Sequence, residues 1–304
     1  MKRILITGGN GFLGSGLVEY FLNQNYKVLV ISRDSYNLTA VMDKIEFVKN
    51  TADDYTPVSD SIRAFSPEYV IHTAWDGGNN YLNIHCLSQF YKNIPLSLSL
   101  LEIVNTLPVK PTFIGVGSFA EYGILHSKAS EDDIEYPINY YGLSKLTVKK
   151  VTELYCSINN IKSVWIRPCY IYGPRDVSTR LIPKLITGII SNQPVNLDSC
   201  DVLIDYLHID DFSKAVDAIM TSGVSGVYNV CSGEEYNLRD IIRFLYNTLS
   251  PDVHPTFGVS PDRTSVSRYI CGTNEKLKSV SNWNSTINIQ DGLLNTIAYY
   301  KNHA

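Results

Sequence analysis

The sequence predicts an α/β protein with a doubly wound parallel sheet and a smaller C-terminal lobe. Short runs of apolar and β-branched residues alternate with longer stretches of helical spacing, which is the pattern of strand–helix–strand units. A glycine-rich turn joins the first run to the first helical stretch, and the loops become longer after Pro168. Because such units place parallel strands side by side with helices on both faces, the sheet should be buried on both sides.

Six segments in the first two-thirds of the chain have the length and composition of strands. They are Arg3–Thr7, Lys27–Ser32, Ile45–Val48, Tyr69–Thr73, Thr112–Val116 and Ser163–Arg167. Helical stretches between them include Phe12–Gln24, Asn93–Asn105 and Tyr140–Asn159. Further on, Ile204–Ile209 is expected to be a strand, Asp210–Thr221 a helix and Val227–Val230 another strand.

We therefore expect the chain to leave the sheet near residue 168, return near residues 205–231 and leave again. This gives one domain of residues 1–167 plus about 205–232, and a lobe of about 168–204 plus 233–304. The lobe should lie over the carboxyl edge of the sheet, where open α/β sheets bind their ligands.

The composition is that of a globular chain of 304 residues, with 44% hydrophobic and 18% charged residues. A formal net charge of −4 gives no reason to expect nucleic acid or an anionic membrane surface as a partner. No apolar run approaches the roughly 18–20 residues of a membrane helix. The apolar stretch Ile4–Ile6 is too short for a signal peptide, so we expect a first strand and a cytoplasmic protein.

The six cysteines and six histidines show no metal-binding spacing. Neither Cys-x-x-Cys nor His-x-x-x-His occurs, so no metal site is predicted. In a cytoplasmic chain the cysteines are expected to be reduced thiols, several of them buried.

The glycine-rich segment Gly8–Gly14 follows the first predicted strand and opens the first helix. Gly8 would allow a tight turn, Gly11 would let the backbone approach a pyrophosphate, and Gly14 would let the helix pack closely on the sheet. The helix N-terminus would offer N–H groups to phosphates. This context predicts a Rossmann-type dinucleotide site rather than a turn that binds nothing. The expected contacts are Gly8, Asn10, Gly11, Phe12, Leu13 and Gly14.

The end of the second predicted strand indicates which dinucleotide binds. NAD sites usually place an acidic residue there, but Ser32 occupies that position and Arg33 follows. A small hydroxyl residue leaves room for a 2′-phosphate, which a guanidinium can bind. We therefore expect NADP(H) to be preferred, with NAD(H) possible. In the alternative, Arg33 is a solvated loop charge and Asp34 serves the ribose.

A Tyr-x-x-x-Lys pattern opens the predicted helix Tyr140–Asn159. Tyr141 and Lys145 are four residues apart and therefore share one helix face. A free phenol has a pKa of about 10, and a nearby ammonium group together with the positive nicotinamide ring would lower it enough for proton exchange with a carbonyl or an alcohol. The pattern alone is common, but with the glycine loop it predicts a proton-transfer pair instead of two amphipathic surface residues.

The spacing Gly-x-x-Gly-x-x-Gly, together with Tyr141 and Lys145, resembles the extended short-chain dehydrogenase/reductase family over nearly the whole chain. This family is also called the NAD-dependent epimerase/dehydratase family. The resemblance implies that Tyr141 is the catalytic acid or base and that Lys145 also holds the cofactor ribose. It implies that Ser118, which follows a strand and is counted back from Tyr122-Gly123, orients the reacting oxygen; the alternative is a serine that caps a turn.

Other positions match the family less specifically. Three residues are expected along the cofactor: Thr73, Ala74 and Pro168. Three more are interpreted as structural. His72 should be a hydrogen-bonded core histidine, Asn93 a buried asparagine and Cys169 a packing residue.

The two residues after Ser118 distinguish among the family's reactions. Sugar-nucleotide 4,6-dehydratases have Asp and then Glu there, and 3,5-epimerase/reductases have a cysteine at the second position. This chain has Phe119 and Ala120. The resemblance therefore implies plain hydride transfer at a carbonyl, either one-way reduction or the oxidation and re-reduction of a 4-epimerase.

The loop around Gln193-Pro194-Val195 and Arg263 resemble the family's nucleotide-sugar 4-ketoreductases. The candidate substrate residues are Ser118, Tyr141, Arg180 and Arg263. Arg263 stands at the place of a diphosphate-binding arginine, although it could equally be a surface residue. Ile204 stands where many relatives have an arginine, so one diphosphate contact is missing or moved.

These observations favour an NADP(H)-dependent reductase of a nucleotide-linked 4-keto-6-deoxy sugar in surface polysaccharide biosynthesis. Three alternatives stay open: a 4-epimerase with tightly bound NAD, a reductase of a small ketone or aldehyde, and a non-catalytic dinucleotide-sensing protein. The family often dimerises through two helices of each subunit, here Asn93–Asn105 and Tyr140–Asn159, so a homodimer is expected.

Overall fold

The computed structural model describes residues 1–77, 85–193, 195–261 and 267–303. Within these residues the main element is a seven-stranded sheet whose neighbouring strands all pair in parallel. In spatial order the strands are β10 (Gly226–Val230), β6 (Ser163–Pro168), β5 (Thr112–Val116), β4 (Tyr69–His72), β1 (Arg3–Thr7), β2 (Lys27–Ser32) and β3 (Glu46–Lys49). The predicted doubly wound parallel sheet is confirmed.

Helices cover both faces of this sheet because its strands bury both sides. Ile4 and Ile6 of β1 belong to a core shared with α1 and α6, whereas Leu5 between them belongs to a core shared with α2, α3 and α4. These helices are α1 (Phe12–Asn23), α6 (Ile209–Ser222), α2 (Ser59–Phe65), α3 (Ser88–Thr106) and α4 (Tyr140–Ile158). The remaining short elements on the sheet side are η1 (Tyr36–Lys44), η2 (Thr56–Val58), η4 (Phe119–Glu121) and α8 (Glu275–Val280).

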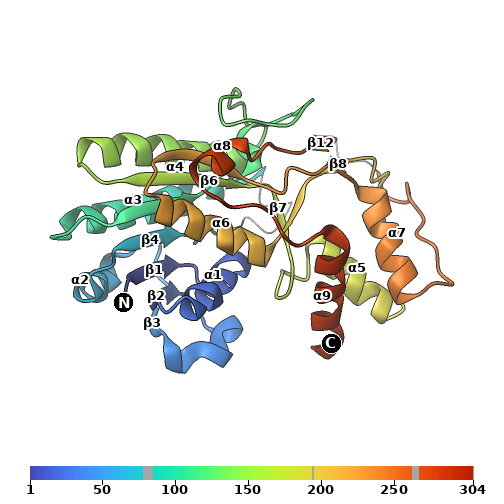
Figure 1. Ribbon diagram of the computed structural model, residues 1–304, viewed down its shortest axis with the longest axis horizontal. Coiled ribbons are helices and arrows are strands. Elements are labelled where there is room, and N and C mark those ends of the chain that lie inside the picture. Colours follow the sequence, from blue (N-terminus) through green and yellow to red (C-terminus); the bar gives the residue numbers. More distant parts are fainter. Residues whose placement is uncertain (78–84, 194, 262–266, 304) are drawn as a thin grey trace.

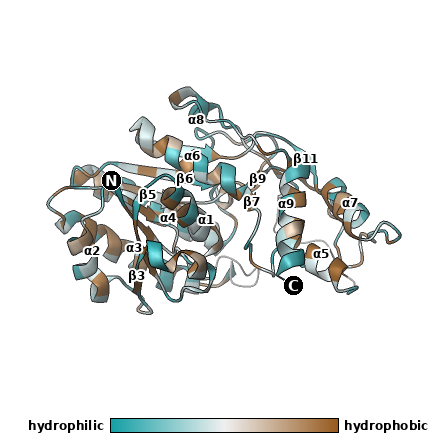
Figure 2. Cartoon of the chain, turned by 60° about the horizontal axis from the view of Figure 1, so that its bottom comes forward, coloured by the Kyte–Doolittle hydropathy of each residue, from teal (hydrophilic) through white to brown (hydrophobic). Residues whose placement is uncertain are grey.

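A smaller lobe lies beside the sheet, on the right in Figure 1. Its helices are α5 (Leu181–Ile190), α7 (Leu238–Leu249) and α9 (Ile289–Asn302), which contribute to a third apolar core. In Figure 2, α5 and α7 carry both hydrophobic and hydrophilic segments, as expected of helices with one buried face. The domain boundaries drawn from the sequence stay a prediction. No helix in the described part of the chain is long and apolar enough to span a membrane.

The segment Ile204–Ile209 does not form the single strand that its composition predicts. It supplies two short strands in two small sheets, and Ile209 already begins α6. One sheet contains β8 (Leu203–Ile204), β11 (Tyr236–Asn237) and β12 (Tyr269–Ile270); the other pairs β7 (Tyr170–Tyr172) with β9 (Tyr206–His208). The chain therefore rejoins the main sheet only at β10.

Asp205 explains this break. Its side chain is fully buried, and its carboxylate accepts hydrogen bonds from the Ser232 N–H at 2.9 Å, the Ser232 hydroxyl at 2.7 Å and the Gly233 N–H at 2.8 Å. These donors fix the junction between β8 and β9. A buried carboxylate with this many donors cannot be displaced without exposing unpaired groups.

The three residues interpreted as structural have that role. His72 is buried between the Thr7 hydroxyl, 2.7 Å from Nδ1, and the Ser97 hydroxyl, 3.0 Å from Nε2. Burial lowers the pKa of His72 to about 3, so it is a neutral core histidine. Asn93 is buried and accepts the Asp76 N–H at 2.7 Å, and Cys169 is a buried thiol whose pKa burial raises.

Asp205→Asn should lower the free energy of unfolding by about 2 kcal/mol, because an amide NH₂ would then face donors that the carboxylate accepts. Denaturant unfolding measures this change. Asp201→Asn is the matched control, since the ion pair of Asp201 with Arg268 is exposed and spans 3.6 Å; its effect should stay below about 0.5 kcal/mol. Equal losses in both variants would show that Asp205 does not hold the junction.

Candidate active site

A cavity of about 1080 Å³ lies at the carboxyl ends of the strands, where the strand order reverses between β1 and β4. This volume exceeds the roughly 300–1,000 Å³ of a typical small-molecule pocket, so a dinucleotide and a second ligand can share it. Arg263 and Pro194 lie outside the described residues. The other predicted site residues all line the cavity: Gly8, Asn10, Gly11, Phe12, Leu13, Gly14, Ser32, Arg33, Thr73, Ala74, Ser118, Tyr141, Lys145, Pro168 and Arg180.

The glycine loop has the geometry that a pyrophosphate requires. Gly8 has a φ of +70°, and a Cβ there would lie 2.7 Å from the backbone of Ala74. A Cβ on Gly11 would meet only the Gly8 carbonyl oxygen, at 3.2 Å, so the backbone on that side is open to the cavity. A Cβ on Gly14 would lie 2.2 Å from the Gly8 carbonyl oxygen, so the glycine lets the first turn of α1 lie directly against the backbone that leaves β1.

Asn10 ties this loop to the segment after β2. Its side-chain amide donates to a carboxylate oxygen of Asp34, and its side-chain oxygen accepts the Asn37 N–H at 2.7 Å. The Asn37 side chain in turn donates to the Asn10 carbonyl oxygen at 2.8 Å. Asn10 therefore holds the residues that follow Ser32 and Arg33 against the glycine loop.

Arg33 lies at the rim of the cavity and is 69% exposed. Its guanidinium pairs with Asp76 at 3.0 Å, and Lys92 pairs with the other oxygen of Asp76 at 3.3 Å. Exposed ion pairs contribute at most about 1 kcal/mol. Arg33 can therefore exchange this carboxylate for a phosphate at little cost.

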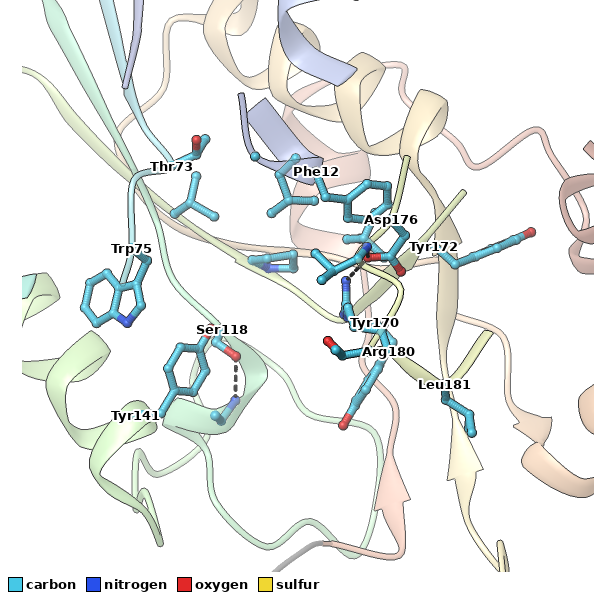
Figure 3. Close-up of a pocket in the computed structure, with 18 of the residues that line it drawn as sticks. Phe12, Thr73, Trp75, Ser118, Tyr141, Tyr170, Tyr172, Asp176, Arg180 and Leu181 are labelled. Carbon is cyan, nitrogen blue, oxygen red and sulfur yellow. Dashed lines mark hydrogen bonds and ion pairs between the residues drawn. The ribbon is translucent and has the colours of Figure 1, made fainter. Parts of the chain in front are cut away.

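Ser118 and Tyr141 lie next to each other on one side of the cavity (Figure 3). Ser118 directly precedes η4, where its hydroxyl oxygen accepts the Ala120 N–H at 3.1 Å. The Asn139 side chain accepts the Gly142 N–H at 2.8 Å and thereby begins α4, which places Tyr141 in the first helical turn. Burial raises the pKa of Tyr141, while a hydrogen bond with Ser118 and the charge of Arg180 oppose the rise. Tyr141 is therefore protonated at neutral pH.

Lys145 is buried and its ammonium group has two close neighbours. Nζ donates to the Val116 carbonyl oxygen at 2.7 Å and lies 3.7 Å from the ring centroid of Trp75. It lies 5.9 Å from the ring centroid of Tyr141. Burial lowers the pKa of Lys145 to about 7, and the charge of Glu121 opposes this change. Among the protein's own groups, burial outweighs the charges around the phenol and raises the pKa of Tyr141; the lowering expected from Lys145 together with the nicotinamide ring stays a prediction.

Glu121 is a site residue that the sequence analysis missed. Its fully buried carboxylate accepts the Ser118 N–H at 2.8 Å, the Trp165 indole N–H at 3.0 Å and Nε of the equally buried Arg167 at 2.7 Å. Arg167 also donates to Glu135. The sequence contained a signal for this role, because Ser118 and Glu121 form the Ser-x-x-Glu pattern of a capping box.

Trp75 is the second missed residue. It follows β4 closely, lines the cavity and lies edge-on to Tyr141, with ring centroids 6.2 Å apart and planes at 89°. A large aromatic residue next to Thr73 and Ala74, at the end of a strand beside the glycine loop, was the available signal.

Arg180 lies on the opposite wall, where its guanidinium pairs with Asp176 at 3.1 Å (Figure 3). It also lies 5.8 Å from the ring centroid of Phe12 in the glycine loop. The carbonyl oxygen of Asp176 accepts the Tyr300 hydroxyl of α9 at 2.6 Å. Ile204 lines the same cavity from β8 with an apolar side chain, so no guanidinium is supplied from that position.

A sequence profile of the NAD dependent epimerase/dehydratase family matches residues 4–231, and the chain belongs to this family, as its motifs predict. It is 24% identical over 273 residues to the dTDP-6-deoxy-L-talose 4-dehydrogenase (NAD(+)) of Aggregatibacter actinomycetemcomitans, with 89% of this chain and 99% of that protein covered. It is 26% identical over 253 residues to the CDP-abequose synthase of Salmonella muenchen, with 80% of each covered. The UDP-glucose 4-epimerase of Thermus thermophilus, solved in complex with NAD, superposes with a TM-score of 0.90 at 22% identity, with 99% of this chain and all of that chain (100%) covered.

Glu121→Gln should lower the free energy of unfolding by about 3 kcal/mol, because the Arg167 guanidinium would lose a buried counter-charge. Thermal or denaturant unfolding measures the loss. Glu275→Gln is the control, since the ion pair of Glu275 with Lys278 is exposed and should contribute less than about 0.5 kcal/mol. A loss no larger than that of the control would contradict the role assigned to the buried pair.

Proposed function

We propose that this protein is an NADP(H)-dependent reductase that acts on the 4-keto group of a nucleotide-linked 4-keto-6-deoxy sugar. The observation that carries the proposal is the position of Tyr141 beside Ser118 in the cavity that also contains the glycine loop. The two positions after Ser118 are occupied by Phe119 and Ala120, which offer neither acid nor base. One positioned proton donor is what hydride transfer to a carbonyl needs.

The residues would share the reaction as follows. When bound, the reduced nicotinamide supplies a hydride for the carbonyl carbon. The Ser118 hydroxyl donates a hydrogen bond to the carbonyl oxygen and orients it toward Tyr141. The Tyr141 hydroxyl gives its proton to that oxygen, the product is a secondary alcohol, and the phenolate regains a proton from solvent. The Lys145 ammonium holds the cofactor ribose and opposes the negative charge that develops on Tyr141.

The relatives support a nucleotide-linked sugar as the substrate. One is named as a 4-dehydrogenase of a dTDP-linked 6-deoxy sugar and another as a CDP-abequose synthase. Arg180 is a cation on the lobe side of the cavity, where it pairs with Asp176. We assign it, together with Arg263, to binding of the substrate's phosphates. The product would then feed surface polysaccharide synthesis.

The preference for NADP(H) is supported by Arg33 and Ser32 at the end of β2. The weakly held pair of Arg33 with Asp76 leaves the guanidinium available to a 2′-phosphate. A second candidate is a 4-epimerase with tightly bound NAD. It is favoured by the link between Asp34 and Asn10, which holds a carboxylate beside the glycine loop, and by the likeness to an epimerase that binds NAD.

A sensing protein and a reductase of small carbonyl compounds have less support. A non-catalytic dinucleotide-sensing protein would have no need of Ser118, Tyr141 and Lys145 in one cavity, yet all three line it. A small ketone or aldehyde would leave much of the lobe side of a cavity of about 1080 Å³ unused.

We also propose that the enzyme is a cytoplasmic homodimer. Helices α3 and α4 pack against each other on one face of the sheet. Their outer surfaces expose large apolar side chains: Tyr91 on α3 and Leu143, Leu154 and Ile158 on α4. A second copy placed on these helices would bury this surface.

Tyr141→Phe should reduce turnover of a 4-keto-6-deoxy sugar nucleotide by about 10²–10⁴-fold, because it removes the proton donor and leaves the ring in place. The assay follows NADPH consumption with CDP-, dTDP-, GDP- and UDP-linked substrates. Tyr140→Phe, one residue away on the exposed side of α4, is the control and should keep its activity. Undiminished turnover in Tyr141→Phe would overturn the mechanism.

Arg33→Ala should remove a preference for NADPH over NADH of tenfold or more, which corresponds to about 1.4 kcal/mol. Fluorescence titration of both reduced cofactors measures the preference. Arg63→Ala is the control, since Arg63 lies on α2 and pairs with the exposed Asp60. If the wild type binds NADH at least as well, or is purified with bound NAD⁺, the epimerase becomes the better hypothesis.

A further inference from the structure

Trp75 is a half-buried neighbour of the proton-transfer pair that no part of the proposed mechanism yet uses. The centre of its ring lies 3.7 Å from the ammonium nitrogen of Lys145. Its indole N–H donates to the side-chain oxygen of Gln89 at 2.8 Å, and Gln89 is itself buried in α3. The N–H end of the Trp75 ring is thus held by Gln89, and the face of the ring contacts Lys145. The Tyr141 ring lies edge-on to the Trp75 ring (Figure 3).

We propose that Trp75 is a positioning residue for Lys145, whose indole face and the Val116 carbonyl together hold the lysine ammonium charged and aimed within the cavity. The consequence for turnover rests on the proposed reductase function. The positioning itself is a property of these side chains and can be measured without any substrate.

The need for such a neighbour follows from burial. An ammonium group has three N–H donors, and the Val116 carbonyl oxygen satisfies one of them at 2.7 Å. A tryptophan face attracts a cation most strongly where water is excluded, and Lys145 is 4% exposed. The indole face therefore replaces part of the solvation that the lysine loses on folding.

The titratable groups around Lys145 do not supply that stabilisation in the same way. Tyr141 on the same helix is protonated, and His72 on β4 is neutral because burial lowers its pKa to about 3. The charge of Glu121 in η4 raises the pKa of Lys145, but this charge is already balanced by Arg167. The Trp75 ring face, 3.7 Å from the ammonium nitrogen, is thus a source of negative potential in addition to the Val116 carbonyl.

Replacing Trp75 should change the pKa of Lys145 in one direction only. The indole face favours the protonated form of Lys145, so its removal must lower the pKa of Lys145. Since burial already lowers that pKa to about 7, a further decrease would leave the amine neutral at physiological pH. In the reduction reaction, the alkaline limb of kcat/KM should move to lower pH, because the pair needs both the phenol proton and the ammonium charge.

The test is a titration of Lys145 by NMR in full-length protein labelled at the lysine ε-carbon, with Lys145→Met identifying the resonance. In Trp75→Leu the midpoint should fall by about one pH unit, and in Trp75→Phe, which keeps a weaker aromatic face, by less than half as much. Trp283→Phe is the control, because Trp283 is a buried tryptophan that donates to the Asp211 carbonyl oxygen, outside this cavity. The titration midpoint of Lys145 in Trp283→Phe should match that of the wild type.

An unchanged midpoint in Trp75→Leu would overturn the proposal. If that variant does not fold by circular dichroism, an unchanged midpoint in Trp75→Phe has the same meaning. The alkaline limb of kcat/KM for NADPH-dependent reduction should shift in the same order as the NMR midpoints. A shift in the midpoints without turnover of any 4-keto sugar nucleotide by the wild type would sink the proposed function and leave the positioning role of Trp75 intact.

Discussion

The buried ion pair of Glu121 with Arg167 is the constraint on which the catalytic end of the sheet depends. Both side chains are fully buried, and the Glu121 carboxylate would be a buried charge without a cationic partner if Arg167 were removed. Arg167 is the residue before the last in β6, while the Glu121 carboxylate accepts the backbone N–H of Ser118 after β5. The pair therefore fixes two strand ends and the loop that presents Ser118. Lys145 donates a hydrogen bond to the carbonyl oxygen of Val116, the last residue of β5. The position of Lys145 therefore also depends on how the ion pair holds the end of β5.

The strand order explains why the residues proposed to bind the cofactor and those proposed to be catalytic meet in one cavity. The chain forms β1, β2 and β3 in order toward one edge of the sheet and then returns to form β4 on the other side of β1. The connections after β1 and β4 therefore leave in opposite directions, which opens a crevice between the ends of these two strands. Because β1 and β4 are neighbours, Gly8 after β1 lies close to the backbone of Ala74 after β4. The segments after β4 and β5 place Trp75 and Ser118 along the same edge, and β6 ends there with Pro168.

The electrostatics of the site follow from burial more than from the charges near the phenol. Burial keeps Tyr141 protonated and lowers the pKa of Lys145 to about 7, so a small change in the surroundings is enough to alter the charge of the lysine near neutral pH. A protonated tyrosine suits the reduction of a carbonyl. The Trp75 face and the Val116 carbonyl hold the Lys145 ammonium group in place, and its position relative to Tyr141 depends on these two contacts.

The sequence by itself determined the parallel sheet, the glycine loop, and the Tyr141/Lys145 helix face. Each of these rests on a local pattern: alternating apolar runs, glycines at a turn, and residues four apart on a helix. It missed the break at Asp205, because the donors that hold this carboxylate come from Ser232 and Gly233, far along the chain. Only the tertiary structure decided the direction of the Tyr141 pKa and the contact of Trp75 with Lys145, since burial and long-range contacts exist only once the strands have assembled.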